Sequence, residues 1–453
     1  MKKILALFVL TFFAVALFAD SFPVKNGEKI LFFGDSITHD GRYIAILQLM
    51  FDSRQLRGVK VMNAGISGQT TAGGLRRIQL DVIDRKPDRV FVLFGMNDVG
   101  RGALYRIDSP ENFKRRKAGL ETFTANQKKL IKLLKDAGIT PVLMTPTAYD
   151  QYQKEGKSDR CNEPGLSDIA QIARTLAKDE KLDLIELHPF MTEVLKKYPE
   201  LRFCGTDLVH PSAAGHALMA ALIAEQLGLA APVAEVTIAA DGKVSSCFAG
   251  VAGLQTTPEK ITFRYAPEHL AVKLPKGFSD VEKVYPFSEK FNREILKITS
   301  LSKGSYKLCA DGVEVGRFTA AELAKGIDLS RLDTPNNKRA EKAFETAKQI
   351  YSCNYTLRTL EQCRQIAFNS KFYKGAPEPE NFNAITEALD RWRDSYGEKW
   401  RYRKYYGYVI GSYRKNAPEE AELVKKLEQI RLQLEKDSAP AAYTITVEKI
   451  QSK

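Results

Sequence analysis

Between Lys29 and about Gly228, short apolar runs alternate with longer segments of helical period. The runs have the length and composition of buried strands and lie at 29–33, 59–63, 89–94, 140–145 and 182–186. Around them, apolar residues recur every three or four positions, with charges opposite, in 42–51, 71–84, 111–137, 165–178 and 213–227. Because parallel strands need crossover connections, this alternation predicts a three-layer α/β/α domain built on a parallel sheet, over residues 20–230.

After Gly228 the pattern changes twice. Alternating or β-branched runs predict strands at 233–238, 260–265, 269–274, 294–299 and 305–310. Asp311-Gly312 has the composition of a hairpin turn leading into 314–318. We therefore expect a small β-rich module over 231–330. From 331 to 453 the helical period returns in 338–370, 380–397 and 419–437, and the alternating segment 443–449 is a candidate last strand of the β module.

The N-terminus has the layout of a secretory signal peptide. Lys2 and Lys3 precede an apolar run of 16 residues, from Ile4 to Ala19, which is shorter than the roughly 20 residues that cross a bilayer. Cleavage after Ala16 or Ala19 is compatible with the pattern, and an uncleaved anchor is the alternative. We expect residues 1–19 to be removed and the protein to be exported to the periplasm or the extracellular space, with no integral membrane segment left.

Charge and cysteine content limit the classes of partner. The net charge of +13, which falls by two when Lys2 and Lys3 are removed, is spread along the chain rather than interleaved with aromatic residues, so we do not expect nucleic acid binding. Disulfides are permitted in an oxidising compartment but their pairing is open, because six cysteines allow 15 connectivities. These cysteines match no zinc spacing: Cys161, Cys204, Cys247, Cys309, Cys353 and Cys363.

The first chemical motif is Gly34-Asp35-Ser36-Ile37-Thr38, directly after the first predicted strand. A serine at a strand-to-helix turn exposes its hydroxyl above the sheet, at the edge where open α/β sheets place their sites. Taken alone, this turn is more simply a capped helix start.

Two further loops follow predicted strands. In the segment 63–70, Gly68 allows close backbone approach to a ligand; phosphate binding is the alternative, but no Gly-Lys-Ser/Thr follows. In Gly95-Met96-Asn97-Asp98, the Asn97 amide is an uncharged donor suited to an oxyanion, or else an ordinary turn former.

The fourth motif is Asp207-Leu208-Val209-His210-Pro211. Pro211 is expected to start the following helix, and a carboxylate three residues before His210 can reach back to its imidazole. The other histidines lack a comparable partner in the sequence and are expected at the surface or in the core, although His39 lies close enough to Ser36 to line a pocket: His39, His188, His216 and His269.

Together and in this order, the four motifs resemble the blocks of the SGNH (GDSL) hydrolases, and they cover a little under half of the chain. The resemblance implies an esterase with Ser36 as nucleophile, His210 as general base and Asp207 as its orienting carboxylate. It implies an oxyanion hole formed by Ser36, Gly68 and Asn97, and needs neither cofactor nor metal. Ile37 stands where the family name has leucine.

A small-molecule or polysaccharide ester is the expected substrate. We favour deacetylation of carbohydrate, because the resemblance includes exported bacterial enzymes with this activity. A broad short-chain carboxylesterase or lysophospholipase-like enzyme is the first alternative, and a glycan-binding envelope protein with an incidental hydrolase domain is the second. A glycosidase would need two carboxylates about 5 to 9 Å apart, which the sequence cannot place. Oligomeric state, the role of residues 231–453 and the ester itself stay open.

Overall fold

A computed structural model describes residues 22–99, 109–153, 163–239, 242–257, 259–299 and 301–451. The predicted signal peptide and Cys161 lie outside these residues. A five-stranded parallel sheet has the order β2-β1-β3-β4-β5 and is made of β1 (Lys29–Gly34), β2 (Lys60–Gly65), β3 (Arg89–Leu93), β4 (Thr140–Met144) and β5 (Leu184–Ile185). All five predicted strands are thus present, and the predicted α/β fold class is confirmed.

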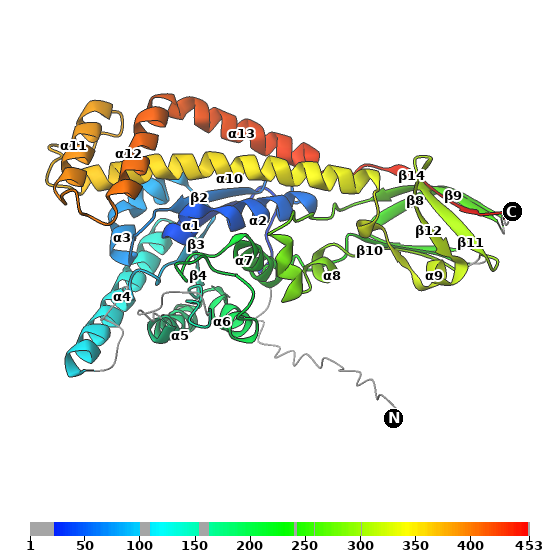
Figure 1. Cartoon of the computed structure of the whole chain (residues 1–453), viewed down its shortest axis with the longest axis horizontal. Helices are drawn as coiled ribbons and strands as arrows, with labels where there is room; N and C mark the ends of the chain where they lie inside the picture. Colours follow the sequence, from blue (N-terminus) through cyan, green and yellow to red (C-terminus); the bar gives the residue numbers. More distant parts are fainter. Residues whose placement is uncertain are drawn as a thin grey trace.

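Helices surround this sheet (Figure 1). They are α1 (Ser36–Asp40), α2 (Arg42–Ser53), α3 (Thr71–Asp81), α4 (Pro110–Asp136), α5 (Glu163–Glu180), α6 (His188–Lys197) and α7 (Ala213–Gln226). The capped helix start expected at Ser36 is the short α1, and the sequence pattern missed α6. The first is a single turn started by the Asp35 side chain, which accepts a hydrogen bond from the Ile37 amide at 3.0 Å. The second begins at His188-Pro189, where proline fits the first helical turn.

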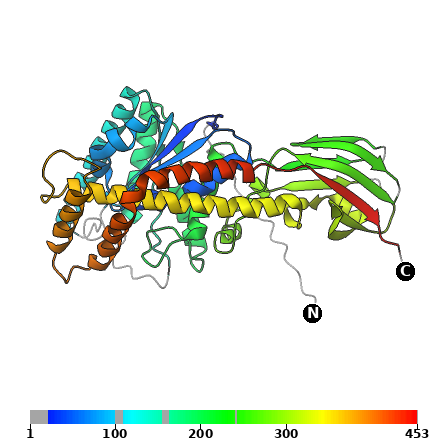
Figure 2. The same cartoon turned by 90° about the horizontal axis from the view of Figure 1, so that it is seen from above.

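Two further sheets form the β-rich part at one end of the molecule (Figures 1 and 2). One has the order β13-β10-β6-β7, the other β12-β11-β14-β9-β8. The strands are β6 (Ala234–Ile238), β7 (Val244–Cys247), β8 (Ala249–Thr256), β9 (Lys260–Pro267), β10 (Glu294–Ile298), β11 (Ser305–Ala310), β12 (Val313–Thr319), β13 (Ile327–Asp328) and β14 (Tyr443–Lys449). The last strand of the chain lies in the middle of its sheet, between β11 and β9.

Local predictions for this part had mixed outcomes. The hairpin turn is confirmed, because Asp311 and Gly312 have φ of 45° and 82° between paired β11 and β12. The predicted strand at 269–274 is wrong. There, the Leu270 amide donates to Ser53 O of α2 and the Val272 backbone is bonded at both ends to the Asn292 side chain, so the segment ties the β-rich part to the α/β domain.

Four helices complete the chain: α10 (Pro335–Phe368), α11 (Phe382–Asp394), α12 (Arg403–Asn416) and α13 (Glu420–Asp437). The sequence pattern gave no bounds for α12, because tyrosines and two glycines obscure the helical period there. Figures 1 and 2 show α10 running along the whole α/β domain with α13 beside it. Residues of both helices belong to the apolar core of that domain, including Phe344, Ile350 and Leu434. They are therefore packed as part of it.

The helices α10 and α13 also close the open edge of the parallel sheet at β2. An edge strand leaves alternate carbonyls without a strand partner. Arg431 of α13 donates to Val61 O at 2.8 Å, and Arg358 of α10 donates to Gly65 O at 3.0 Å. Arg85 donates to Asn63 O between them, at 2.9 Å. Arginine side chains thus take the place of a sixth strand.

Candidate active site

Ser36, His210 and Asp207 form a hydrogen-bonded line at the carboxyl end of the parallel sheet. His210 Nε2 lies 2.8 Å from Ser36 Oγ, and His210 Nδ1 contacts the Asp207 carboxylate. Partial burial works against the charged form of Asp207, but hydrogen bonds from His210 hold its pKa well below the usual range. Because an ionised carboxylate only accepts, Nδ1 carries the proton and Nε2 is left to accept from the serine hydroxyl.

The loop that carries His210 is held by its own backbone. Asp207 Oδ1 accepts from the Val209 and His210 amides at 3.1 and 3.0 Å, which forces Leu208 to a φ of 63°. Pro211 does not start the next helix, contrary to the prediction. Pro211 instead forms an isolated antiparallel β-bridge with Cys204. Ser212 is the N-cap of α7, because its side chain accepts a hydrogen bond from the Gly215 amide. His210 is therefore positioned by a short antiparallel contact rather than by a helix end.

Close packing explains the glycine two positions before Ser36. A Cβ on Gly34 would lie 2.4 Å from Thr38 Oγ1 and 2.5 Å from Leu93 O, so only glycine lets β1 turn directly into α1. Asp35 is buried and caps that helix, which places Ser36 at its first position. The motif is thus a capped helix start, and the same cap fixes the position of Ser36.

Gly68 and Asn97 lie at the same end of the sheet, in loops after β2 and β3. Asn97 Nδ2 donates to Gln69 O at 3.0 Å and lies 3.4 Å from Asp35 Oδ2, so it bridges the neighbours of Gly68 and Ser36. Gly68 has a φ of 78°, and among the residues that the structure describes no heavy atom beyond its chain neighbours lies within 4 Å of the place where its Cβ would be. The structure thus joins Ser36 to His210 and Asp207 by hydrogen bonds, and it places Gly68 and Asn97 in neighbouring loops at the same end of the sheet.

Two of the other histidines have partners that the sequence did not reveal. His216 is buried with Nε2 3.1 Å from Asp40 Oδ1, so the expectation that it lacks a carboxylate partner is wrong. His39 is 2% exposed, with Nδ1 3.1 Å from Ser67 Oγ and Nε2 3.3 Å from Thr359 Oγ1. It lies beneath the Gly68 loop instead of lining an open pocket.

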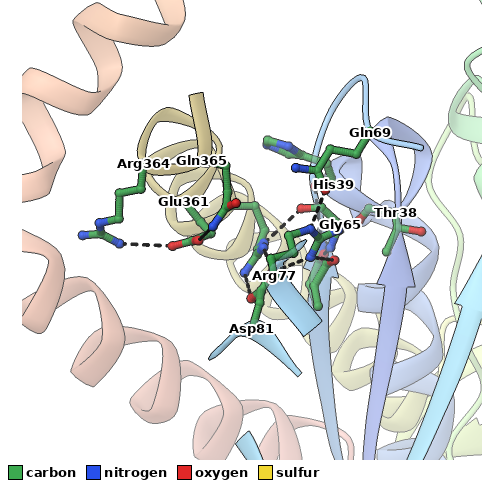
Figure 3. A network of polar contacts seen from close by, with 12 residues as sticks. Thr38, His39, Gly65, Gln69, Arg77, Asp81, Glu361, Arg364 and Gln365 are labelled. Atoms are coloured by element: carbon green, nitrogen blue, oxygen red, sulfur yellow. Dashed lines mark hydrogen bonds and ion pairs between the residues drawn. The ribbon is translucent and has the colours of Figure 1, made fainter. Parts of the chain in front are cut away.

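A buried network of arginines around Asp81 was also missed (Figure 3). Arg77 donates to Gly34 O at 2.9 Å and Ala64 O at 2.8 Å, at the ends of β1 and β2, and pairs with Asp81. Arg358 reaches the same carboxylate from α10. Burial opposes ionisation of Asp81, yet Arg358 and Arg77 hold its pKa below the ordinary value. Arg77 and Asp81 are four positions apart on one helix, a spacing that favours an ion pair and could have been recognised in the sequence. The sequence around Arg358 contains no corresponding sign that this residue pairs with Asp81.

Other features of the described residues are quickly stated. Cys204, Cys247, Cys309, Cys353 and Cys363 carry free thiols. Within 22–99, 109–153, 163–239, 242–257, 259–299 and 301–451, no cluster of three or more histidine, cysteine or acidic side chains could hold a metal ion. None of the helices in that part of the chain is long and apolar enough to span a bilayer.

Comparison with known proteins identifies the family. Residues 32–218 match the model of the GDSL-like lipase/acylhydrolase family. The acetylxylan esterase of Geobacillus stearothermophilus is 30% identical over 225 residues, which are 45% of this chain and 96% of that enzyme. This chain belongs to the GDSL-like lipase/acylhydrolase family. It is accordingly a carboxylic ester hydrolase.

Further relatives of this GDSL-like hydrolase extend the comparison. The arylesterase of Vibrio mimicus is 28% identical over 220 residues, covering 47% of this chain and 94% of the relative. A solved structure described as a gut microbial diltiazem-metabolizing enzyme has a TM-score of 0.81 at 24% identity and covers 95% of this chain and 99% of its own. That likeness shows that the whole three-part fold, with its β-rich and helical regions, recurs in another protein.

Proposed function

We propose that Ser36 is the nucleophile of an acyl-enzyme mechanism, on the strength of the His210 Nε2 contact to its hydroxyl at 2.8 Å. His210 accepts the proton as Ser36 Oγ bonds to the carbonyl carbon, and returns it to the departing alcohol. Water then attacks the acyl-enzyme with the same proton transfers, and the acid is released. Asp207 keeps His210 in the tautomer that can accept.

The negative charge on the carbonyl oxygen is proposed to be stabilised by three donors. They are the Ser36 N–H, the Gly68 N–H and the Asn97 side-chain amide. Open space beside Gly68 supports this, because a carbonyl group can approach the backbone there. The Asn97 side chain is held beside the Gly68 loop by its hydrogen bond to Gln69 O.

The acyl group is proposed to be acetate on a carbohydrate. The relative named acetylxylan esterase supports this assignment, and so does the signal-peptide pattern of residues 1–19, which favours export to the periplasm or beyond, where polysaccharides are met. The arylesterase relative supports the alternative of a broad short-chain carboxylesterase.

A group of tyrosines beside the site offers a surface for the sugar. The ring of Tyr355 contacts the ring of His39 in a tilted arrangement, with centroids 5.0 Å apart, and Tyr351 lies one turn away on α10. Burial raises the pKa of Tyr355 to about 12, with further contributions from the nearby hydroxyls of Tyr405, Tyr351 and Tyr408. On α12, Tyr405 and Tyr408 are 42% and 68% exposed. Tyrosine rings present apolar faces to sugar C–H groups and hydroxyls to sugar oxygens.

Acetate release from acetylated xylan, pectin, chitin and peptidoglycan, with p-nitrophenyl acetate as reference, tests the proposal. Wild type is compared with Ser36→Ala and with the matched control Ser352→Ala, an exposed serine on α10. Ser36→Ala should abolish hydrolysis of every ester and Ser352→Ala should leave it intact. Equal rates for wild type and Ser36→Ala would sink the mechanism. Turnover of p-nitrophenyl acetate with none of the polysaccharides would favour the broad carboxylesterase.

If glycan binding rather than hydrolysis is the main role, Ser36→Ala will retain polysaccharide in a pull-down while wild-type turnover stays negligible. This outcome would identify the glycan-binding alternative.

A further inference from the structure

The proposed oxyanion donor Gly68 is flanked by two anchored residues. On one side, the Ser67 amide donates to His39 Nδ1 at 3.2 Å. On the other, Gln69 O accepts from Asn97 and Gln69 Oε1 accepts from Arg77 Nε at 2.5 Å. The position of the Gly68 N–H therefore depends on His39 as directly as on Asn97.

His39 is held in one protonation state and one tautomer. Burial, and next the charge of Arg358, lowers its pKa to about 3, so the ring is neutral. Because the Ser67 amide donates to Nδ1, the single ring proton is on Nε2. That N–H points to Thr359 Oγ1, whose own hydroxyl donates to Tyr355 O at 2.8 Å. A relay of donors thus runs from the Gly68 loop through His39 and Thr359 to the backbone of α10.

Helix α10 holds the start of the same loop by a second contact. Arg358, next to Thr359, donates to Gly65 O and to the buried Asp81 carboxylate, which Arg77 also contacts (Figure 3). Gly65 is packed so closely on α1 that a Cβ would lie 2.1 Å from the His39 amide nitrogen. At Gly65 the start of the loop therefore contacts both α1 and α10.

We propose that Thr359 and Arg358 of the C-terminal helix α10 are positioning residues for ester hydrolysis, acting through His39 and Gly65 to aim the Gly68 N–H at the oxyanion. The inference rests on the proposed oxyanion role of Gly68. It assigns a contribution to catalysis to residues far beyond that loop in sequence, since 293 positions separate Arg358 from Gly65.

The test uses the full chain with Thr359→Val, which keeps shape and removes the acceptor for His39, and Thr359→Ser, which restores it. Thr356→Val is the matched control, because Thr356 Oγ1 bonds only within α10, to Ser352 O at 3.1 Å. We expect Thr359→Val to lower kcat about tenfold with KM within about twofold of wild type, as for loss of an interaction made in the transition state. Thr359→Ser should recover most of kcat.

A second pair probes the histidine itself. His39→Asn keeps an acceptor, Oδ1, close to the position of Nδ1, whereas His39→Leu has none. We expect the asparagine variant to be the more active, and inhibition by phenylboronic acid, which mimics the tetrahedral intermediate, to weaken in parallel with kcat/KM across the variants.

If Thr359→Val and Thr356→Val have the same kcat while Ser36→Ala is inactive, the inference is overturned and the proposed function stands. An active Ser36→Ala would overturn the proposed function instead. A loss in Thr359→Val that Thr359→Ser does not reverse, or that follows the melting temperature across all variants, would show a merely structural role and also overturn the inference.

Discussion

Replacing Arg358 by methionine measures how far the C-terminal helices stabilise the α/β domain. The change removes the hydrogen bond to Gly65 O and both contacts to Asp81, at a site where the side chains are 8% and 6% exposed. Removing one partner of a buried ion pair costs about 3–5 kcal/mol, because a desolvated charge is left behind. Asp81 keeps Arg77 and Arg85 nearby, so we expect the lower end, about 3 kcal/mol.

Urea unfolding followed by tryptophan fluorescence and by far-UV circular dichroism is the assay. Both tryptophans of the chain, Trp392 and Trp400, lie in the C-terminal helical region, so fluorescence reports there and dichroism reports the whole molecule. The matched control is Arg339→Met, because Arg339 is also on α10 but bonds the end of α13, through Ala439 O and Lys436 O.

A double-mutant cycle that combines Arg358→Met with Asp81→Asn measures the interaction energy between Arg358 and Asp81. Because Arg358 and Asp81 are in direct contact, we expect a coupling energy of about 1.5 kcal/mol or more. Coupling below about 0.5 kcal/mol, together with equal destabilisation by Arg358→Met and Arg339→Met, would refute the view that this ion pair joins α10 to the site.

Three further outcomes are expected. Asn97→Ala should lower kcat on p-nitrophenyl acetate by about a hundred- to a thousandfold, as for loss of an oxyanion donor, and a fall of less than tenfold would contradict that role. Tyr405→Ala and Tyr408→Ala should raise KM about three- to tenfold for acetylated oligosaccharides but not for p-nitrophenyl acetate, with the exposed Tyr396→Ala as control. Burial raises the pKa of Glu294 from 4.5 to about 7, so the folded protein binds more protons than the unfolded chain between these values. Glu294 should therefore contribute a fall of about 3 kcal/mol in the free energy of unfolding as the pH rises through that window. In calorimetric melts, Glu294→Gln should reduce the slope by that contribution and leave the one from Asp52, whose pKa burial raises to about 8.

The parts of the fold that could be predicted are those encoded within a few residues. Strands such as 89–94 are buried on both faces, so their apolar runs stand out, and three of the four site motifs directly follow the end of a strand. Mostly exposed β8 left no such run, and 269–274 alternates like a strand but has no strand beside it. The apolar residues of 269–274, among them Leu270 and Val272, are buried in the core of the α/β domain instead.

The partners of buried polar residues could not be predicted, because tertiary packing decides them. His216 meets Asp40 across two helices, and His39 meets Thr359 across 320 positions of sequence. No local pattern distinguishes Arg358 from the exposed lysines of the same helix, which are Lys338, Lys342 and Lys348. The sequence therefore predicted which residues could do the chemistry, and the structure was needed to find those that hold them in place.

The position of the site in the sheet explains why such holding residues come from so far along the chain. Ser36 follows β1 and Asn97 follows β3, in the sheet interior, but Gly68 follows β2, the edge strand, whose outer side no strand covers. In this chain the same arginine, Arg358, both covers the β2 edge and fixes the start of the Gly68 loop. Deleting the C-terminal helices would thus uncover an edge strand and release the loop of the proposed oxyanion donor Gly68 at once. A fragment of residues 20–230 should therefore be less active than the full chain even where it folds.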